Sequence, residues 1–363
     1  MRSPHLLYIL AHRITDRLFL PSLQLKDVPR PKPAEGQILV QLSAAALNHR
    51  DLFQRRHQYR AISFENPILA DGYGTVIELG PNVSRKDLLN RPVILTPMRG
   101  WEEDPIGPEG PMAVTGGTTL TEVGTAQDFI VVDQEEVMPA PDHLSAVEGA
   151  ALPLVGVTSW RALVTKAGCT TPGKNLLITG IGGGVALQTL QFGVAFGLNV
   201  YVTSGSQEKL DRAVAMGAKG GVIYRNESWD KELKAMLPKD RPYLDAVVDG
   251  AGGKVVSKVV RLLREGGVIA QYGMTVAPKM EWLMPAVLAN IELKGTTMGS
   301  RREFRDMVTF VNKHKIKPVV SRVVKGLDKL DAINGLFEEM DAGKQFGKLV
   351  IEIDGRSGSP SKL

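Results

Sequence analysis

The pattern of hydrophobic and polar residues divides the chain into two kinds of sequence. Up to about residue 150, short apolar runs such as 37–42 and 75–79 are separated by clusters of Pro and Gly, which predicts a region dominated by β-strands. From about Leu152, strand-like runs alternate with amphipathic segments of helical length, a pattern that predicts a parallel sheet wound with helices. The strands expected in this second region are 176–179, 200–203, 221–224, 246–248 and 268–272. A smaller β/α segment follows from about residue 295.

Length and composition are those of a soluble protein with more than one domain. A chain of 363 residues is long enough for about two domains, each with its own hydrophobic core. Its 43% hydrophobic and 23% charged residues are near the globular average, which excludes a disordered or coiled-coil chain. The net charge of +5 comes from scattered basic residues without a run of like charges, so we expect no nucleic-acid partner.

Two further features narrow the class of protein. Cys169 is the only cysteine, so the chain forms no internal disulfide and no cysteine-based zinc cluster. Residues 175–207 carry no charge and are long enough to span a bilayer, but glycines and amide side chains interrupt the stretch. We therefore interpret it as a buried strand, turn, helix and strand, and expect no membrane association.

Within that stretch, a glycine-rich turn joins a predicted strand to a predicted helix. The apolar run 176–179 leads into the turn, and residues 186–195 form the helix. This order of elements is typical of a dinucleotide-binding site, where the glycines let the backbone approach a pyrophosphate and the helix N-terminus offers unpaired N–H groups. Val185 stands where Gly or Ala is usual. The residues expected to contact the cofactor are Gly180, Gly182, Gly183, Gly184 and Val185.

The end of the next strand indicates which nicotinamide cofactor binds. NAD sites place Asp or Glu about 20 residues after the first glycine, where the carboxylate holds the ribose 2′-hydroxyl and repels a 2′-phosphate. Here the strand ends in Ser204-Gly205-Ser206, and the first carboxylate is Glu208. Hydroxyl groups and an ammonium suit a phosphate, so the sequence predicts NADPH. The residues expected around the 2′-phosphate are Ser204, Lys209 and Tyr224.

The C-terminal segment predicts a cellular location. Residues 355–363 are polar and are expected to form a flexible tail that ends in Ser361-Lys362-Leu363. At a free carboxyl terminus this tripeptide is the address read by the peroxisomal import receptor, so we expect a peroxisomal protein. The Arg-bearing, acid-poor N-terminal segment leaves a mitochondrial presequence as the alternative.

These features resemble the medium-chain dehydrogenase/reductase superfamily, in particular its zinc-free quinone-oxidoreductase and enoyl-reductase branch and the proteins named zinc-type alcohol-dehydrogenase-like. The similarity rests on residues 25–29, 46–51, 204–210 and the glycine turn. It implies an α/β fold: a GroES-like β-barrel catalytic domain with an inserted Rossmann domain, which is a doubly wound parallel sheet. The implied boundaries are 1–155 and 295–354 for the catalytic domain and 156–294 for the NADP-binding domain. The resemblance also implies a small-molecule substrate and a homodimer.

The resemblance also bears on metal binding. Zinc-dependent members hold the metal with a Cys, a His and a second Cys or Asp, and at two of these positions the present chain has Asn48 and Ala70. Neither position offers a thiolate or an imidazole, so we expect no metal. Alcohol oxidation needs a Lewis acid or a strong base, whereas reduction of a conjugated C=C bond or a quinone needs only a hydrogen-bond donor or proton source. A reductase is therefore favoured.

Candidate catalytic residues follow from the same resemblance. In the zinc-free branch a tyrosine eleven residues after the Asn reaches into the cleft, and the matching residue here is Tyr59. We expect the Tyr59 phenol to supply a proton and Asn48 to position the nicotinamide ribose. Three roles stay open for His49: a proton relay, a contact to the cofactor phosphates, or a structural residue. Ser300 and Arg301 match the position of a pyrophosphate contact.

The sequence thus predicts an enzyme, an NADPH-dependent zinc-free oxidoreductase. It is expected to transfer a hydride to an activated C=C bond, as in an enone, enal or enoyl thioester, or to a quinone. Two alternatives stay open: a zinc-type alcohol dehydrogenase, and a non-catalytic NADPH-binding protein, since a fold provides a cofactor pocket but does not guarantee turnover. Zinc analysis distinguishes the reductase from the alcohol dehydrogenase, which would contain about one zinc ion per chain. A Tyr59→Phe variant that binds NADPH but loses turnover would distinguish the reductase from a non-catalytic protein.

Overall fold

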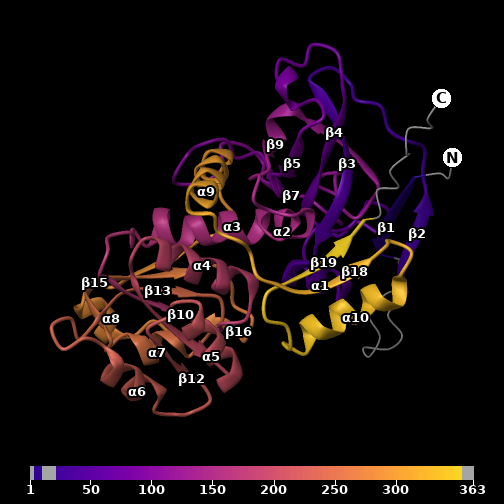
Figure 1. Cartoon of the computed structure of the whole chain (residues 1–363). Coiled ribbons are helices and arrows are strands. Elements are labelled where there is room, and N and C mark those ends of the chain that lie inside the picture. The colour runs from indigo at the N-terminus through magenta and orange to yellow at the C-terminus, as the bar shows by residue number, and fades with distance from the viewer. Residues whose placement is uncertain (1–3, 10–21, 354–363) are drawn as a thin grey trace. The chain divides into compact units, whose positions relative to one another are not determined.

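The structure, a computed structural model, describes residues 4–9 and 22–353. The predicted targeting tripeptide Ser361-Lys362-Leu363 lies outside the described residues, as does the rest of the tail 355–363. The described chain forms two compact units (Figure 1). One runs up to Leu154 and resumes at Val308, and the other is Val155–Met307. No helix in the described residues is long and apolar enough to cross a membrane.

The first unit is rich in β-structure. Its main sheet has the strand order β18–β19–β3–β4–β5–β9, and β8 also pairs with β3. Neighbouring strands in this sheet are antiparallel except for β18 and β19. The strands of the unit are β1 (His5–Ile9), β2 (Leu23–Asp27), β3 (Gln37–Ala46), β4 (Asp71–Leu79), β5 (Pro92–Leu95), β6 (Met98–Arg99), β7 (Ala113–Val114), β8 (Phe129–Asp133), β9 (Val137–Pro139), β18 (Val320–Lys325) and β19 (Lys348–Glu352). Its helices are α1 (His49–Arg55), α2 (Ala146–Ala150) and α10 (Leu330–Asp341), with 3-10 turns η1 (Lys86–Leu88) and η2 (Gln134–Glu136).

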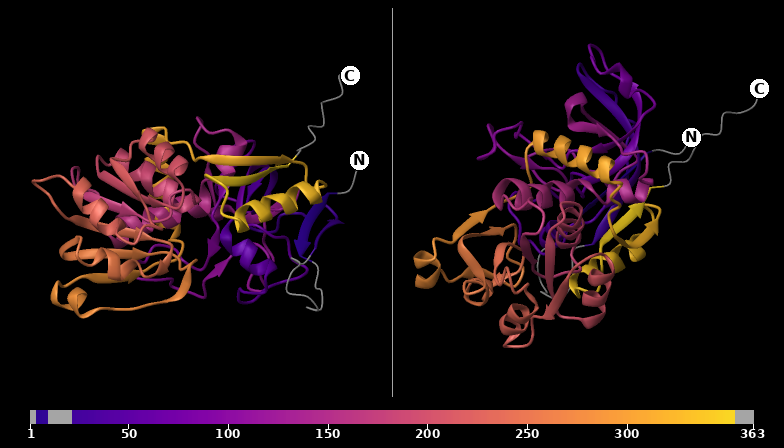
Figure 2. Two further views of the ribbon diagram at one scale, coloured as in Figure 1. Left: turned by 90° about the horizontal axis from the view of Figure 1, so that it is seen from below. Right: turned by 60° about the vertical axis from the view of Figure 1, so that its left-hand side comes forward.

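Strand β19 brings the last described segment of the chain beside β3. The two strands are antiparallel, with Val350 opposite Ala46, so the residues that follow β3 lie next to the residues that begin β19. Helix α10 runs along β18 and β19 (Figures 1 and 2) and buries Ile333, Leu336 and Phe337 in the core. This pairing places one end of β3 and the start of β19 together.

The second unit alternates strands and helices. Its sheet has the order β12–β11–β10–β13–β15–β17, with every neighbouring pair parallel. The strands are β10 (Asn175–Ile178), β11 (Asn199–Ser204), β12 (Gly220–Ile223), β13 (Leu244–Asp249), β15 (Leu263–Gln271) and β17 (Glu292–Gly295), with a small pair, β14 (Gly252–Gly253) and β16 (Ala277–Met280). The helices are α4 (Gly184–Ala195), α5 (Gln207–Ala215), α6 (Trp229–Met236), α7 (Val255–Val259), α8 (Met284–Leu288) and the π-helical η3 (Arg161–Lys166). Helices α3 (Pro153–Trp160) and α9 (Arg301–His314) each cross a boundary between the units.

The predicted fold class, a parallel sheet wound with helices beside a β-rich domain, is confirmed. Strand β10 is buried along its whole length, which explains why its sequence is a continuous apolar run rather than an alternating one. From β10 the chain adds β11 and β12 on one side and then returns to β13 on the other. Open α/β sheets bind ligands at the carboxyl ends of strands where the order reverses in this way.

The second boundary between the units differs from the sequence-based one. The sequence places the return to the catalytic domain at residue 295, which proves to be the last residue of the edge strand β17. In the structure the division falls at Met307, inside α9. The reason is that the first turn of α9 is tied to η3 of the second unit, through an ion pair between Glu303 and Arg161 at 2.9 Å.

Candidate functional site

The glycine turn follows β10 and opens α4. Gly180 and Gly182 have φ angles of +64° and +130°, which residues with side chains rarely adopt. The turn is held against the end of β11, because the amides of Gly180 and Ile181 donate to the hydroxyl and carbonyl oxygens of Thr203 at 3.1 and 2.7 Å. Helix α4 then begins with Gly183 as its N-cap.

The N-terminus of α4 forms an open cradle. A methyl group built on Gly180 would meet no atom within 4 Å, and one on Gly183 would meet only the Gly180 carbonyl oxygen at 4.0 Å. The first N–H groups of a helix have no acceptor within the helix, and the helix dipole adds positive potential there. Gly184 and Val185, the first residues of α4, are half-buried. The backbone at the predicted positions therefore fits a pyrophosphate.

The residues predicted to hold a 2′-phosphate lie around the end of β11. Tyr224 is exposed, and its amide donates to the Ser204 carbonyl at 3.0 Å. A methyl group on Gly205 would lie 2.6 Å from the Tyr224 hydroxyl and 3.4 Å from Nη2 of Arg225, so both side chains reach over this turn. Lys209, in the first turn of α5, is half-buried, and the loss of surrounding water lowers its pKa below the usual value.

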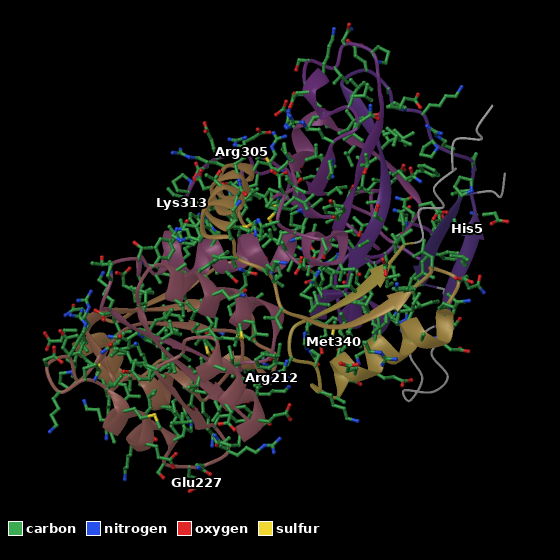
Figure 3. All side chains as sticks on the ribbon, viewed as in Figure 1. His5, Arg212, Glu227, Arg305, Lys313 and Met340 are labelled. Atoms are coloured by element: carbon green, nitrogen blue, oxygen red, sulfur yellow. The ribbon has the colours of Figure 1, made fainter. Side chains whose placement is uncertain are left out.

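Arg225 is a candidate that sequence reasoning missed. The only signal is its position directly after Tyr224 at the end of a strand, and its approach to Gly205 appears only in the structure. The first carboxylate after β11, Glu208, instead forms an exposed ion pair on α5 at 3.8 Å. Its partner is Arg212, which is labelled in Figure 3. The end of β11 therefore offers cationic and hydroxyl groups to a ligand.

Ser300 has a structural role at the start of α9. Its amide donates to Oε2 of Glu303 at 2.7 Å, and the Glu303 amide donates to the Ser300 hydroxyl at 3.1 Å, which forms a capping box. The same glutamate accepts a hydrogen bond from buried Arg161 at 2.9 Å. Ser300 is fully buried. Cofactor contacts by Ser300 and Arg301 stay a prediction.

In the first unit, Asn48 belongs to a buried group that we call the polar cluster: Asn48, Arg50, Asp51, Asp71 and Lys348. Lys348 Nζ donates to Oδ1 of Asn48 at 2.6 Å and to Oδ2 of Asp71 at 2.9 Å. Asn48 Nδ2 donates to the same Asp71 oxygen at 2.9 Å. The lysine and the carboxylate thus form a hydrogen-bonded ion pair that is almost entirely shielded from solvent.

The polar cluster joins three separate segments of the chain. Asn48 is the N-cap of α1, Asp71 begins β4 and Lys348 begins β19. The other oxygen of Asp71 accepts the amide of Leu154 at 2.8 Å. Asp71 is 0% and Lys348 4% exposed. The sequence predicted a role for Asn48 but not for its charged partners Asp71 and Lys348. The only local signal was that Lys348 directly precedes the apolar run 349–351.

Tyr59 is connected to the polar cluster through Arg50. The Asn48 amide donates to Oδ2 of Asp51 at 2.8 Å, and Arg50 Nη1 donates to the other oxygen of Asp51 at 3.1 Å. The Arg50 guanidinium lies over the ring of half-buried Tyr59, 5.2 Å from its centroid. Burial raises the pKa of Asp51 to about 6, against the opposing effect of Arg50. The two predicted catalytic residues thus share one network.

His49 begins α1 directly after Asn48 of the polar cluster. Its pKa is lowered, first because surrounding protein removes water from the imidazole and then because Lys348 adds a positive charge nearby. The ring also meets Phe53 edge to face at 6.0 Å. The neutral form is therefore favoured at neutral pH, while the role of His49 in a proton relay stays a prediction.

The residues at the expected metal positions do not fit a zinc ion. The only ligand oxygen of the Asn48 side chain accepts a hydrogen bond from an ammonium group at 2.6 Å. Ala70 is buried and presents a methyl group where an imidazole is required. A dication bound to Asn48 would lie beside the buried charge of Lys348, and the repulsion between them in a dry interior is strong.

Comparison with known proteins identifies the family. Residues 34–142 match the alcohol dehydrogenase GroES-like domain, and residues 184–313 match the zinc-binding dehydrogenase family. The chain is 56% identical over 338 residues to the zinc-type alcohol dehydrogenase-like protein YogA of Leptosphaeria maculans. That similarity covers 91% of this chain and 94% of the relative.

Solved structures share the fold over nearly the whole chain. A putative alcohol dehydrogenase from Sinorhizobium meliloti 1021 has a TM-score of 0.85 and 29% identity, covering 97% of this chain and 100% of that one. The crotonyl-CoA carboxylase/reductase AntE in complex with NADP has the same fold, with a TM-score of 0.80 and 19% identity over 96% of this chain and 94% of that one. From the two matched domains and the relative with 56% identity, it follows that this chain belongs to the medium-chain dehydrogenase/reductase superfamily of oxidoreductases.

Proposed function

We propose that this chain is a zinc-free, NADPH-dependent reductase that adds a hydride to an activated C=C bond or to a quinone. The observation that supports it most is the 2.6 Å contact between the Lys348 ammonium and the Asn48 oxygen, at a position where the resemblance implies a zinc ligand. A fixed positive charge is already present there, and Ala70 offers no second ligand. Reactions that proceed without a metal suit such a site.

The choice of NADPH is supported by the end of β11. Tyr224 and Arg225 reach over Gly205, and Lys209 follows in the first turn of α5. Charge-assisted hydrogen bonds from a guanidinium or an ammonium favour a cofactor with a 2′-phosphate. NADPH, when bound, supplies the hydride, and the open turn at Gly180 and Gly183 is where its pyrophosphate fits.

The chemistry assigned to Tyr59 follows from the product of hydride addition. A hydride that adds to the β-carbon of an unsaturated carbonyl moves the C=C electron pair toward the oxygen and forms an enolate. The Tyr59 phenol donates a hydrogen bond to that oxygen and then gives up its proton, which forms an enol. Tautomerisation of the enol, with loss of the O–H proton and addition of a proton at the α-carbon, then gives the saturated carbonyl product. Arg50, 5.2 Å from the ring centroid, stabilises the phenolate until solvent returns a proton.

The test combines NADPH oxidation with metal analysis. Purified protein is assayed against 2-enals, enones, enoyl-CoA thioesters and quinones, and its zinc content is measured by mass spectrometry. We expect turnover with at least one acceptor, no stoichiometric zinc, and NADPH bound at least about tenfold more tightly than NADH, a difference of ~1.4 kcal/mol. Alcohol oxidation with about one zinc ion per chain, as the name of the Leptosphaeria maculans relative suggests, would contradict the proposal. Binding of NADPH without turnover would identify a non-catalytic protein.

We also propose that two copies of this chain pair along β17. This strand is the edge of its sheet, and six large hydrophobic side chains nearby are exposed: Val276, Trp282, Met284, Val287, Leu288 and Leu293. If β17 meets its copy antiparallel around Leu293, Glu292 of each chain faces Lys294 of the other. We expect Lys294→Glu to weaken the dimer and the exchange Glu292→Lys with Lys294→Glu to restore it in analytical ultracentrifugation. A monomeric wild-type protein would refute the pairing.

Peroxisomal import through Ser361-Lys362-Leu363 is likewise a proposal. The import receptor requires a free carboxylate, so the first measurement is the mass of the C-terminal peptide in protein from its natural source. A tagged protein without these three residues is then expected to stay in the cytosol and to remain folded. An unchanged punctate distribution would show that the tripeptide is not the address, and mitochondrial staining would favour the N-terminal segment.

A further inference from the structure

The ammonium of Lys348 is fully enclosed. Its three hydrogens have three acceptors: the Leu47 carbonyl at 2.7 Å, the Asn48 amide oxygen at 2.6 Å and the Asp71 carboxylate at 2.9 Å. Burying a lysine costs free energy that its partners must offset, and an apolar residue paired with a neutral one is often as stable. The next three residues in β19, 349–351, are buried and apolar, so this part of the strand does not require a charge.

These contacts fix the orientation of the Asn48 amide. Its oxygen faces the ammonium of Lys348 and its nitrogen faces the carboxylate of Asp71. If the amide turned over, its NH2 group would face an ammonium and its oxygen would face a carboxylate, and both contacts would be repulsive. Asn48 Nδ2 has two hydrogens, and the described residues provide an acceptor for one of them. The second is left to donate.

We propose that Lys348 is a positioning residue that replaces the catalytic metal as the fixed positive charge of this site. It holds the Asn48 amide so that the second Nδ2 hydrogen donates to the oxygen that becomes negative during hydride transfer. The ammonium also polarises the amide, since a proton donor at Oδ1 draws electrons from nitrogen and makes its N–H groups more acidic. This inference rests on the proposed reductase function, and it names the source of electrostatic stabilisation for that reaction.

The first experiment removes the charge and keeps the length of the side chain. In Lys348→Met, we expect kcat for NADPH oxidation to fall about 10- to 100-fold, less than the about 100- to 1,000-fold seen when a donor to a developing oxyanion is removed, because Asn48 itself remains. The KM for NADPH should stay unchanged within about twofold. Lys348→Arg keeps the charge and is expected to retain most of the turnover. Equal losses in the two variants, or no loss in Lys348→Met, would overturn the proposal.

A second variant separates this role from charge balance alone. Lys348→Met leaves Asp71 buried without a partner and can fail to fold for that reason. The double variant Asp71→Asn with Lys348→Met removes both charges together. We expect it to unfold at a temperature closer to that of the wild type than Lys348→Met does, yet to keep the loss in kcat. Wild-type kcat in the double variant would mean that Lys348 serves only to neutralise Asp71.

An NMR measurement tests, without an activity assay, whether Lys348 orients the Asn48 amide. In protein labelled with ¹⁵N at asparagine, the two Nδ2 hydrogens of Asn48 are identified by their absence in Asn48→Ser. We expect the two proton chemical shifts to differ widely in the wild type, because only one of the hydrogens is bonded to a carboxylate. In Lys348→Met we expect the difference between the two shifts to become smaller. Unchanged resonances would refute the positioning role. If the wild type reduces no acceptor in the panel, the proposed function fails, while this spectrum still decides whether Lys348 orients Asn48.

Discussion

The glycine turn and the polar cluster are built in opposite ways. The turn comes from one continuous stretch, residues 180–185, and the groups it offers are backbone N–H groups at the start of α4. The polar cluster joins side chains from α1, β4 and β19, and the contact between Asn48 and Lys348 links residues 300 positions apart. The turn depends on φ angles that favour glycine, and the cluster depends on balanced charges. A substitution that adds a side chain should therefore disrupt the glycine turn, and a substitution that removes a charge should disrupt the polar cluster.

The largest effect is expected from Gly182→Val. Its φ of +130° is strained for any side chain, and the branched residue would stand where the pyrophosphate passes. We expect NADPH affinity to fall more than about 100-fold in a fluorescence titration, a loss of ~2.8 kcal/mol or more. Gly173→Val is the matched control, since Gly173 also has a positive φ, +80°, and open space around it, but precedes β10 rather than following it. Normal NADPH binding to Gly182→Val would place the cofactor elsewhere.

The turn was predictable because all of its information is local. An apolar run buried on both faces, four glycines and a helix-forming stretch follow one another in the sequence, and each has its expected conformation in β10, the turn and α4. The absence of a carboxylate between β11 and Glu208 is likewise read directly from consecutive residues. Arg225 was not predictable, because its approach to Gly205 depends on the distance in space between the turn after β12 and the turn after β11.

The polar cluster could be predicted only in part. Asn48 was found through a family pattern, but nothing near it in the sequence indicates Asp71 or Lys348. Their meeting requires the antiparallel pairing of β19 with β3, which sets Val350 opposite Ala46. Long-range strand pairing is decided by the whole sheet rather than by the residues at one position. The structural role of Ser300 was missed for a different reason, since the capping-box pattern with Glu303 was present but a cofactor role was assigned instead.

Tyr59→Phe tests whether the network around the polar cluster performs chemistry. The phenol is lost while the ring, its contact with Arg50 and the glycine turn remain. We expect kcat to fall about 100-fold, at the lower end of the range for proton donors, and the Kd for NADPH to stay within about twofold. Tyr73→Phe is the control, because Tyr73 is also half-buried in the first unit but packs close to Gly149 of α2. Full activity in Tyr59→Phe would remove this residue from the mechanism.

A smaller effect is expected where side chains rather than backbone recognise the cofactor. Lys209→Ala and Arg225→Ala should each narrow the preference for NADPH over NADH about tenfold, ~1.4 kcal/mol, chiefly by weakening NADPH. Arg212→Ala is the control, since Arg212 lies on the same helix as Lys209 and forms an exposed ion pair with Glu208. Equal losses for both cofactors would show that these residues support the fold of the turn instead of reading the 2′-phosphate.

The last prediction concerns stability rather than binding or turnover, through the proton on Asp51, the buried carboxylate that joins Asn48 to Arg50. Burial raises its pKa from 3.8 to about 6. Because the folded form holds this proton more tightly than the unfolded form does, the stability contributed by Asp51 is fully present below about pH 3.8 and is lost as the pH rises through about 6. Ionised Asp51 is therefore a cost to the folded state at neutral pH, unlike anything in the glycine turn, which has no ionisable group.

Asp51→Asn should remove this pH dependence while keeping an oxygen to accept the Asn48 amide. Between about pH 4.5 and about pH 6.5, the stability of the wild type relative to the variant is expected to fall by about 2 kcal/mol, which corresponds to a few degrees in the unfolding temperature. Thermal unfolding of both proteins across this range measures it, with the exposed Asp240→Asn as the control for loss of a carboxylate. Parallel curves for wild type and Asp51→Asn would mean that Arg50 and Lys348 keep Asp51 ionised in the folded state at low pH, so that charge balance in the polar cluster outweighs burial.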